Sequence, residues 1–121
     1  MAPDGTEIIV GVTRDPTGLL ALTLGAGGVL TEVLRDSATL VLPAPRDEVR
    51  AALMSLRVGA LLRGYRGRPG ADLDALLDAV QAIAAYAEGE SDRLVELDVN
   101  PLIAGPHGAV AVDALIRLEA P

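Results

Sequence analysis

The sequence contains no cysteine, no lysine, no phenylalanine and no tryptophan among its 121 residues. Without cysteine there is no disulfide bond, no thiolate metal ligand and no thiol nucleophile. Because two tyrosines are the only aromatic residues, we expect a core of aliphatic side chains. These absences indicate an aliphatic protein without thiol chemistry.

Positive charge and long hydrophobic runs are also scarce. The formal net charge is −7 at pH 7, so the basic surface typical of nucleic-acid-binding proteins is absent. No hydrophobic run approaches the roughly 20 residues needed to span a membrane, and no signal peptide precedes the first expected strand. We therefore expect a cytoplasmic protein with no nucleic-acid or membrane partner.

A chain of this length suits one domain with its own core, although it is short for an enzyme with a closed nucleotide cleft. We assign residues 1–121 to a single domain in which residues 1–6 form a flexible lead. No internal repeat or linker divides it.

The first part of the chain favours β-strands. Residues 7–13 form a continuous hydrophobic run, which predicts a strand buried on both sides. A turn at 14–18, set by an Asp-Pro pair and ended by glycine, leads to a second strand over 19–24. Two further strands are expected over 29–34 and 38–42.

Helical spacing dominates the middle of the chain. It predicts helices over 47–56 and 57–63 and a longer one over 72–88. Runs of strands beside grouped helices are typical of an α+β fold. We expect a mostly antiparallel β-sheet with two or three helices packed on one face. The hydrophobic stripe of the long helix comprises Leu73, Leu76, Leu77, Val80, Ile83, Ala84 and Ala87.

The segment after the long helix alternates between hydrophobic and polar residues, which is the period of a half-buried strand. A hairpin turn at 105–108 would bring the chain back beside it. The hydrophobic set is Val95, Leu97 and Val99, and the polar set is Glu96, Asp98 and Asn100. In this register Ala104 faces Ala109, Leu102 faces Ala111, Asn100 faces Asp113, and Val110 and Val112 share the face of Val99.

The polar side of this hairpin gathers oxygen atoms. Cross-strand neighbours have Cβ atoms roughly 5 Å apart, so Asp98, Asn100 and Asp113 would direct oxygens to one point. Carboxylates completed by phosphates and water are the ligands that Mg²⁺ takes in a nucleotide site. The alternative is a solvated outer face on which Asn100 and Pro101 end the strand.

Two other stretches leave alternatives open. The glycine-rich residues 25–28 suit either an anion cradled by backbone N–H groups or a tight connection between strands. The loop over 64–70 carries Arg66 and Arg68, which suit either a phosphate or carboxylate contact or simple solvation. No helix clearly begins after the glycines, so they form neither a P-loop nor a dinucleotide-binding turn.

Residues 97–103, followed after a glycine-containing turn by 111–116, resemble the end of the ATP-grasp domain of NDP-forming acyl-CoA synthetases. The succinyl-CoA synthetase β subunit carries a related version. By this resemblance Asn100 and Asp113 hold the Mg²⁺ of the nucleotide, and Asp98 is a third position, acidic, that contacts the metal directly or through its outer shell.

The resemblance extends along nearly the whole chain in the family's order. Residues 7–16 are similar to its opening hairpin, 25–36 to its glycine loop and following strand, and 62–67 to its Gly-Tyr-Arg-Gly turn. Thr17 departs from the family, which usually has an aromatic residue there. By resemblance, the residues implied in phosphate contact are Arg14, Gly27, Gly28 and Arg66.

The family's first ATP-grasp subdomain supplies a phosphate-binding lysine and the adenine-binding hinge. Since this chain has no lysine, it resembles only the second subdomain, the C-terminal half with the metal ligands. The resemblance implies Mg²⁺ and ATP or ADP as ligands. It also implies two partners: the missing lysine-bearing subdomain, and a CoA-binding domain or subunit with the phosphorylated histidine. A homodimer remains open.

The chain's only histidine, His107, lies between Pro106 and Gly108 in the expected turn. It lacks the sequence context of the family's phosphohistidine, so we interpret it as a surface turn residue.

The sequence therefore predicts a fragment or subunit of an acyl-CoA synthetase that is inactive alone. An alternative is a non-catalytic, degenerate ATP-grasp module that binds a partner or regulates a fused enzyme such as an acyltransferase. A third alternative is an acidic scaffold without a ligand.

Overall fold

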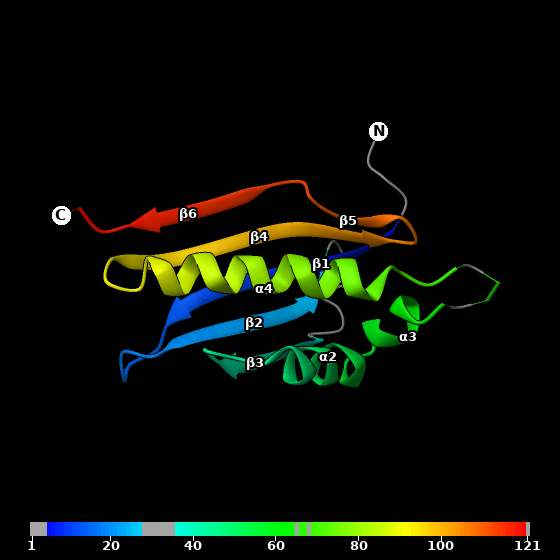
Figure 1. Ribbon diagram of the computed structural model, residues 1–121, viewed down its shortest axis with the longest axis horizontal. Helices are drawn as coiled ribbons and strands as arrows, with labels where there is room; N and C mark the ends of the chain where they lie inside the picture. Colours follow the sequence, from blue (N-terminus) through cyan, green and yellow to red (C-terminus); the bar gives the residue numbers. More distant parts are fainter. Residues whose placement is uncertain (1–4, 28–35, 65, 68, 121) are drawn as a thin grey trace.

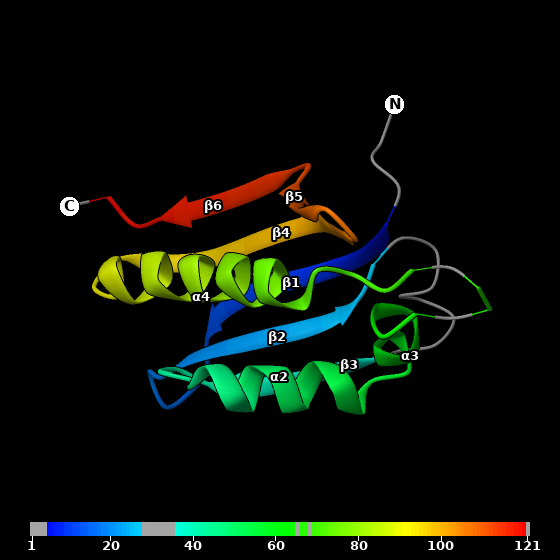
Figure 2. The same cartoon turned by 45° about the vertical axis from the view of Figure 1, so that its right-hand side comes forward.

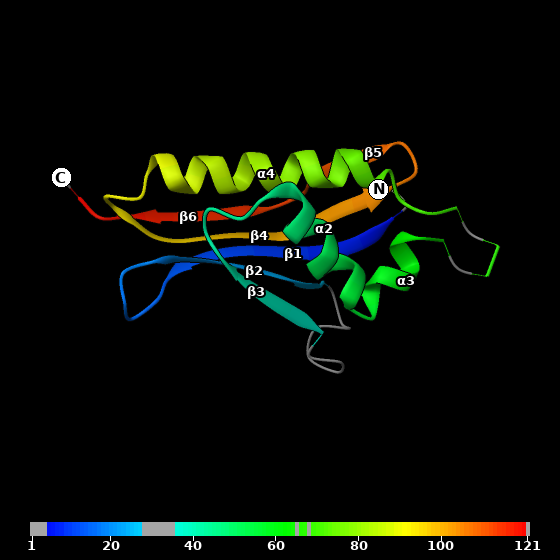
Figure 3. The same ribbon diagram turned by 60° about the horizontal axis from the view of Figure 1, so that its bottom comes forward.

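The computed structural model describes residues 5–27, 36–64, 66–67 and 69–120. Within them, six strands form one antiparallel sheet and the helices gather on one of its faces (Figures 1 and 3). This arrangement confirms the predicted α+β class. The strands are β1 (Thr6–Arg14), β2 (Leu20–Ala26), β3 (Ser37–Val41), β4 (Leu94–Gly105), β5 (Gly108–Ala111) and β6 (Ala114–Leu118). The helices are α2 (Arg46–Ser55), α3 (Val58–Leu62) and α4 (Leu73–Gly89).

Most expected elements are present with boundaries shifted by one or two residues. The strand expected over 29–34 lies outside the described residues, as do residues 1–4 of the expected lead, whose last residue, Thr6, belongs to β1. No helix in the described part of the chain is long and apolar enough to cross a membrane.

The sheet has the strand order β3-β2-β1-β4-β5, and β6 also pairs with β4. The first half of β4 pairs with β6 and its second half pairs with β5. The last two strands therefore lie one after the other along the same side of β4. Figure 2 shows α4 and α2 side by side on the same face, and none of the helices in the described residues lies on the opposite face. We call the uncovered side the open face.

The first strand is buried on one side only, so the prediction of burial on both sides is wrong. Ile8, Val10 and Val12 are fully buried, whereas Ile9 and Gly11 are partly exposed. The physical reason is that the helices cover a single face of the sheet, and alternation sends every second residue of β1 to the open face.

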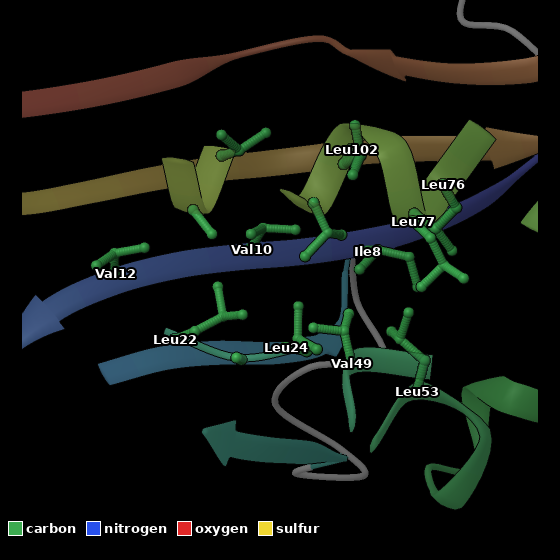
Figure 4. Close-up of a cluster of buried hydrophobic side chains, with 14 of the residues drawn as sticks. Ile8, Val10, Val12, Leu22, Leu24, Val49, Leu53, Leu76, Leu77 and Leu102 are labelled. Atoms are coloured by element: carbon green, nitrogen blue, oxygen red, sulfur yellow. The ribbon is translucent and has the colours of Figure 1, made fainter. Parts of the chain in front are cut away.

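The core between the sheet and the helices is entirely hydrophobic and aliphatic, as predicted. No polar or charged side chain is buried in the described part of the chain. Figure 4 shows strand side chains meeting those of α2 and α4. The largest fully buried residues are Ile8, Val10, Val12, Leu22, Leu24, Val49, Leu53, Leu76, Leu77, Val80 and Leu102.

The long helix α4 begins where the sequence predicts. The Asp72 carboxylate accepts a hydrogen bond from the Ala75 N–H at 3.0 Å, which caps the first turn. Of the expected stripe, Leu73 and Ile83 are partly buried and the other members are buried. On a second side, Arg46 of α2 forms ion pairs with Asp74 (3.3 Å) and Asp78 (2.6 Å), joining the two helices.

Replacing Asp72 with alanine should lower the free energy of unfolding by about 1 kcal/mol, because the Ala75 N–H loses its acceptor. Chemical denaturation of both proteins measures the difference. Asp72→Asn should retain most of the stability, since asparagine is an equally good N-cap. Equal losses in the two variants would contradict a capping role.

The sequence misplaces three valines around β4. Val95 was expected in the core but is 37% exposed, because the pairing of β4 with β6 shifts between Leu94 and Glu96. Val110 and Val112 were expected on the covered face beside Val99 but are each just over half exposed.

A second irregularity of β4 explains Val110. Val99 pairs with Val10, and Leu102 pairs with Ile8. Val10 and Ile8 are two positions apart, whereas Val99 and Leu102 are three positions apart, and yet both β4 residues lie on the covered face. The side-chain alternation therefore changes phase between them. Val110 pairs with Ile103, which alternation sets opposite the core residues Leu102 and Ala104, so Val110 lies on the side of the sheet away from the helices.

Candidate functional site

The structure brings Asn100 and Asp113 together. The Asn100 N–H donates a hydrogen bond to the Asp113 carbonyl oxygen at 3.0 Å, and the next contact, Val112 N–H to the Pro101 carbonyl, is also 3.0 Å. The predicted pairs Leu102 with Ala111 and Ala104 with Ala109 are present as well. The hairpin register predicted from the sequence is therefore correct at the backbone level.

The two residues lie where β4 changes partners. Val99 pairs with Ala114 of β6, whereas Leu102 pairs with Ala111 of β5. Asn100 and Asp113 occupy the junction between these ladders, and both are exposed. This position gives their side chains access to a ligand.

Asp98 lies on β4, two residues before Asn100. It is flanked by Gly11 of β1 and Leu115 of β6, and alternation sets it opposite the buried Leu97 and Val99, on the open face. A Cβ added at Gly11 would lie 4.0 Å from Asp98 Oδ1, so the glycine leaves the space beside this carboxylate unfilled.

The three residues supply two carboxylates and one amide oxygen, a hard-oxygen donor set of the kind that magnesium takes together with phosphates. Neither Asp98 nor Asp113 forms an ion pair with any described residue. Among the described residues no group of three His, Cys, Asp or Glu side chains is placed to hold a metal by itself. The amide of Asn100 and further ligands from outside would have to complete the shell.

Arg14 lies at the other end of the sheet from Gly27. Its guanidinium donates to the carbonyl oxygens of Gly18 (2.9 Å) and Leu94 (3.3 Å) and to that of Ser91. These bonds tie the β1–β2 turn to the segment between α4 and β4. A structural role accounts for the contacts of Arg14, and its predicted phosphate contact stays a prediction.

The glycines at the end of β2 are explained by close backbone contact. The Gly27 N–H donates to the Glu7 carbonyl at 2.8 Å, and a Cβ on Gly27 would lie 3.0 Å from the Glu7 Cβ. A Cβ added at Gly25 would likewise lie 3.0 Å from the Asp36 carbonyl oxygen. Gly25 belongs to β2, which favours the tight connection over the anion cradle there, and Gly28 lies outside the described residues.

Arg66 adopts a positive φ of 51° between Gly64 (φ 103°) and Gly67 (φ 80°). Its loop projects at the end of the sheet where β2 ends, away from Arg14 (Figure 1). Its neighbour Arg68 lies outside the described residues. The structure thus separates Arg14 and Arg66 to opposite ends of the molecule.

His107 lies exposed in the turn between β4 and β5, as expected for a surface turn residue. Gly105 pairs with Gly108, so residues 105–108 form the predicted hairpin turn.

No local sequence pattern indicates the role of Asp36. Its carboxylate accepts hydrogen bonds from the N–H groups of Arg57 (2.9 Å) and Val58 (2.8 Å), which joins the entrance of β3 to the start of α3. Only the tertiary structure brings residues 21 and 22 positions apart into this contact.

A shallow depression of about 380 Å³ lies elsewhere, beside Arg14, Leu42 and Ser91, far from Asn100.

The fold is that of an ATP-grasp subdomain. The family described as ATP-grasp domain matches residues 1–118. The chain therefore belongs to the ATP-grasp family.

Relatives within this family are acyl-CoA synthetases. The chain is 32% identical over 121 residues to the acetate–CoA ligase (ADP-forming) II β subunit of Pyrococcus furiosus, covering 98% of this chain and 51% of that one. It is 33% identical over 118 residues to the I β subunit of the same organism, covering 98% and 50%. The chain is thus homologous to these subunits and spans about half their length.

Solved structures of related proteins have the same fold. The dinucleotide-forming acetyl-coenzyme A synthetase 1 of Ca. Korarchaeum cryptofilum, in complex with coenzyme A and Mg-AMPPCP, matches with a TM-score of 0.89 and 34% identity, covering 98% of this chain and 55% of that one. A protein from Pyrococcus horikoshii matches with a TM-score of 0.89 and 31% identity, covering 100% and 52%. An ATP-grasp protein with this fold therefore holds a magnesium nucleotide analogue.

Proposed function

We propose that this chain forms the metal-binding, C-terminal half of the nucleotide cleft of an NDP-forming acyl-CoA synthetase. The observation that carries the proposal is the backbone contact between Asn100 and Asp113, which sets these two residues side by side at the junction of β5 and β6. The homologous subunits act as ADP-forming acetate–CoA ligases, and one relative of the same fold is in complex with Mg-AMPPCP.

The proposed work of this half is to hold and orient a metal–phosphate group. Phosphoryl transfer spreads negative charge over oxygen atoms, and a magnesium ion bridging phosphates neutralises that charge. Asn100 and Asp113 would contact the metal, and Asp98 would contact it directly or through water. The net charge of −7 repels a polyphosphate, and a bound divalent cation would offset that repulsion.

The partner is the half that the chain does not contain. A cleft closed from one side only leaves a nucleotide in water, where each electrostatic contact is weak. With no lysine, this chain offers no ammonium group for the phosphates. We propose that a lysine-bearing subdomain covers the open face, and that a CoA-binding unit with a phosphorylated histidine completes the enzyme.

Joining the chain to a lysine-bearing half tests this proposal. We would replace the matching segment of the Pyrococcus furiosus II β subunit by this chain and titrate both proteins with Mg-ATP in a calorimeter. The 121-residue chain alone should bind weakly or not measurably, and the joined protein should bind at least about tenfold more tightly, because enclosure lowers the local dielectric. A folded joined protein that binds no better would instead favour a non-catalytic module.

A further inference from the structure

Strand β6 forms an unprotected margin of the sheet. Within the described residues it pairs only with β4. Edge strands usually carry lysine, proline or free charges that prevent pairing with another chain. β6 has no proline or lysine. Its one charged residue, Arg117, forms an ion pair with Glu96, with 3.4 Å between the guanidinium Nη1 and the carboxylate Oε1.

The outer side of β6 presents backbone hydrogen-bonding groups. On its inner side, the Asp113 carbonyl accepts from Asn100, and the Glu119 N–H donates to the Arg93 carbonyl at 2.7 Å. In an antiparallel strand both backbone groups of a residue point to the same side, and the side alternates along the chain. The backbone N–H and C=O groups of the odd-numbered residues of β6 therefore point towards β4. The outward groups belong to Ala114, Ile116 and Leu118.

We propose that β6 pairs in antiparallel fashion with β6 of a second copy of this chain, about a two-fold axis that passes beside Leu115. Ala114 of each copy then exchanges both backbone hydrogen bonds with Ile116 of the other. The two Leu115 side chains, each 52% exposed in the single chain, meet on the axis. The pairing joins the two sheets into one.

Charge favours this register over those centred on Ile116 or Arg117. With Leu115 on the axis, Asp113 of one copy lies opposite Arg117 of the other, so two opposite-charge pairs flank the leucines. Centring the axis on Ile116 would set Asp113 opposite Glu119, and centring it on Arg117 would set two arginines together. Both alternatives place like charges opposite each other, which is destabilising.

The pairing does not depend on nucleotide binding. It uses the edge backbone, Leu115 and Ile116, and it requires no metal. Asp113 belongs to both surfaces, yet loss of metal binding would leave the backbone pairing in place.

Because the chain has no cysteine, a single introduced cysteine reports the register without ambiguity. Facing residues at a non-hydrogen-bonded position have Cα atoms roughly 4.5 Å apart, within the range of about 4.4–6.8 Å that a disulfide spans. Leu115→Cys should therefore form a covalent dimer on mild oxidation. Ile116→Cys has similar exposure (45%) but faces Ala114, so it should cross-link at least about tenfold more slowly.

Val110→Cys, at a site 51% exposed on β5, controls for random collision. Sedimentation of the unmodified chain should show a concentration-dependent dimer, and Ile116→Pro, which removes an outward N–H group, should be monomeric while keeping its helical circular dichroism. The proposal is overturned if Leu115→Cys cross-links no faster than Val110→Cys, if Ile116→Cys is faster than Leu115→Cys, or if the unmodified chain stays monomeric at millimolar concentration.

Discussion

Replacing Asp113 with alanine should weaken Mg-ATP binding by the joined halves at least about tenfold, since loss of a residue that only supports a metal ligand already costs about 10–100-fold. The Asp113 backbone bonds Asn100, and its exposed carboxylate forms no ion pair with a described residue, so its removal leaves the fold intact. Calorimetric titration at fixed Mg²⁺ measures the change.

A matched control separates a specific ligand from general charge. Asp92 is also an exposed aspartate, but it lies in the turn after α4, beside the depression near Arg14. Asp92→Ala changes the net charge by the same amount and should leave Mg-ATP affinity unchanged. Equal losses in both variants, or no loss in Asp113→Ala, would remove Asp113 from the site.

Replacing Leu24 with alanine should lower the free energy of unfolding by about 2–5 kcal/mol. Leu24 is fully buried in β2, between Val10 of β1 and Ala38 of β3, and under the helices (Figure 4). Truncation removes hydrophobic contacts and leaves a cavity that a rigid sheet cannot close. Since domains are stable by only about 5–15 kcal/mol, the loss is a large share of the total.

Urea denaturation monitored by circular dichroism measures this effect. Val41 supplies the control, because it lies in neighbouring β3 with 54% of its surface exposed. Val41→Ala should change the free energy of unfolding by no more than about 0.5 kcal/mol. Similar losses at both sites would contradict the assignment of the covered face as the core.

The sequence predicted the fold class and the register of the last hairpin because both follow from local patterns. Helix α4 has a continuous hydrophobic stripe and an aspartate cap, and the β4–β5 turn contains two glycines and a proline. Asn100 and Asp113 were predicted to face each other from that register alone, and their backbones do.

The errors arose where tertiary pairing overrides a simple period. Val95 and Val110 are misplaced because the alternation of β4 shifts at two points, and those shifts depend on what β1 and β6 offer across the sheet. Ile9 looked buried because a hydrophobic run does not reveal that only one face of the sheet is covered. The contacts of Arg14 and Asp36 join distant segments, which no local pattern contains.

The location of the bound cation tests the central claim most directly. We would label the chain with ¹⁵N within the joined protein, add ATP with Mn²⁺ in place of Mg²⁺, and record which amide signals the paramagnetic ion broadens. The strongest broadening should fall on Asp98, Asn100 and Asp113, with Asp74 and Asp92 little affected. Sharp signals at Asn100 and Asp113 while amides elsewhere broaden would contradict the assignment of the metal to the β5–β6 junction.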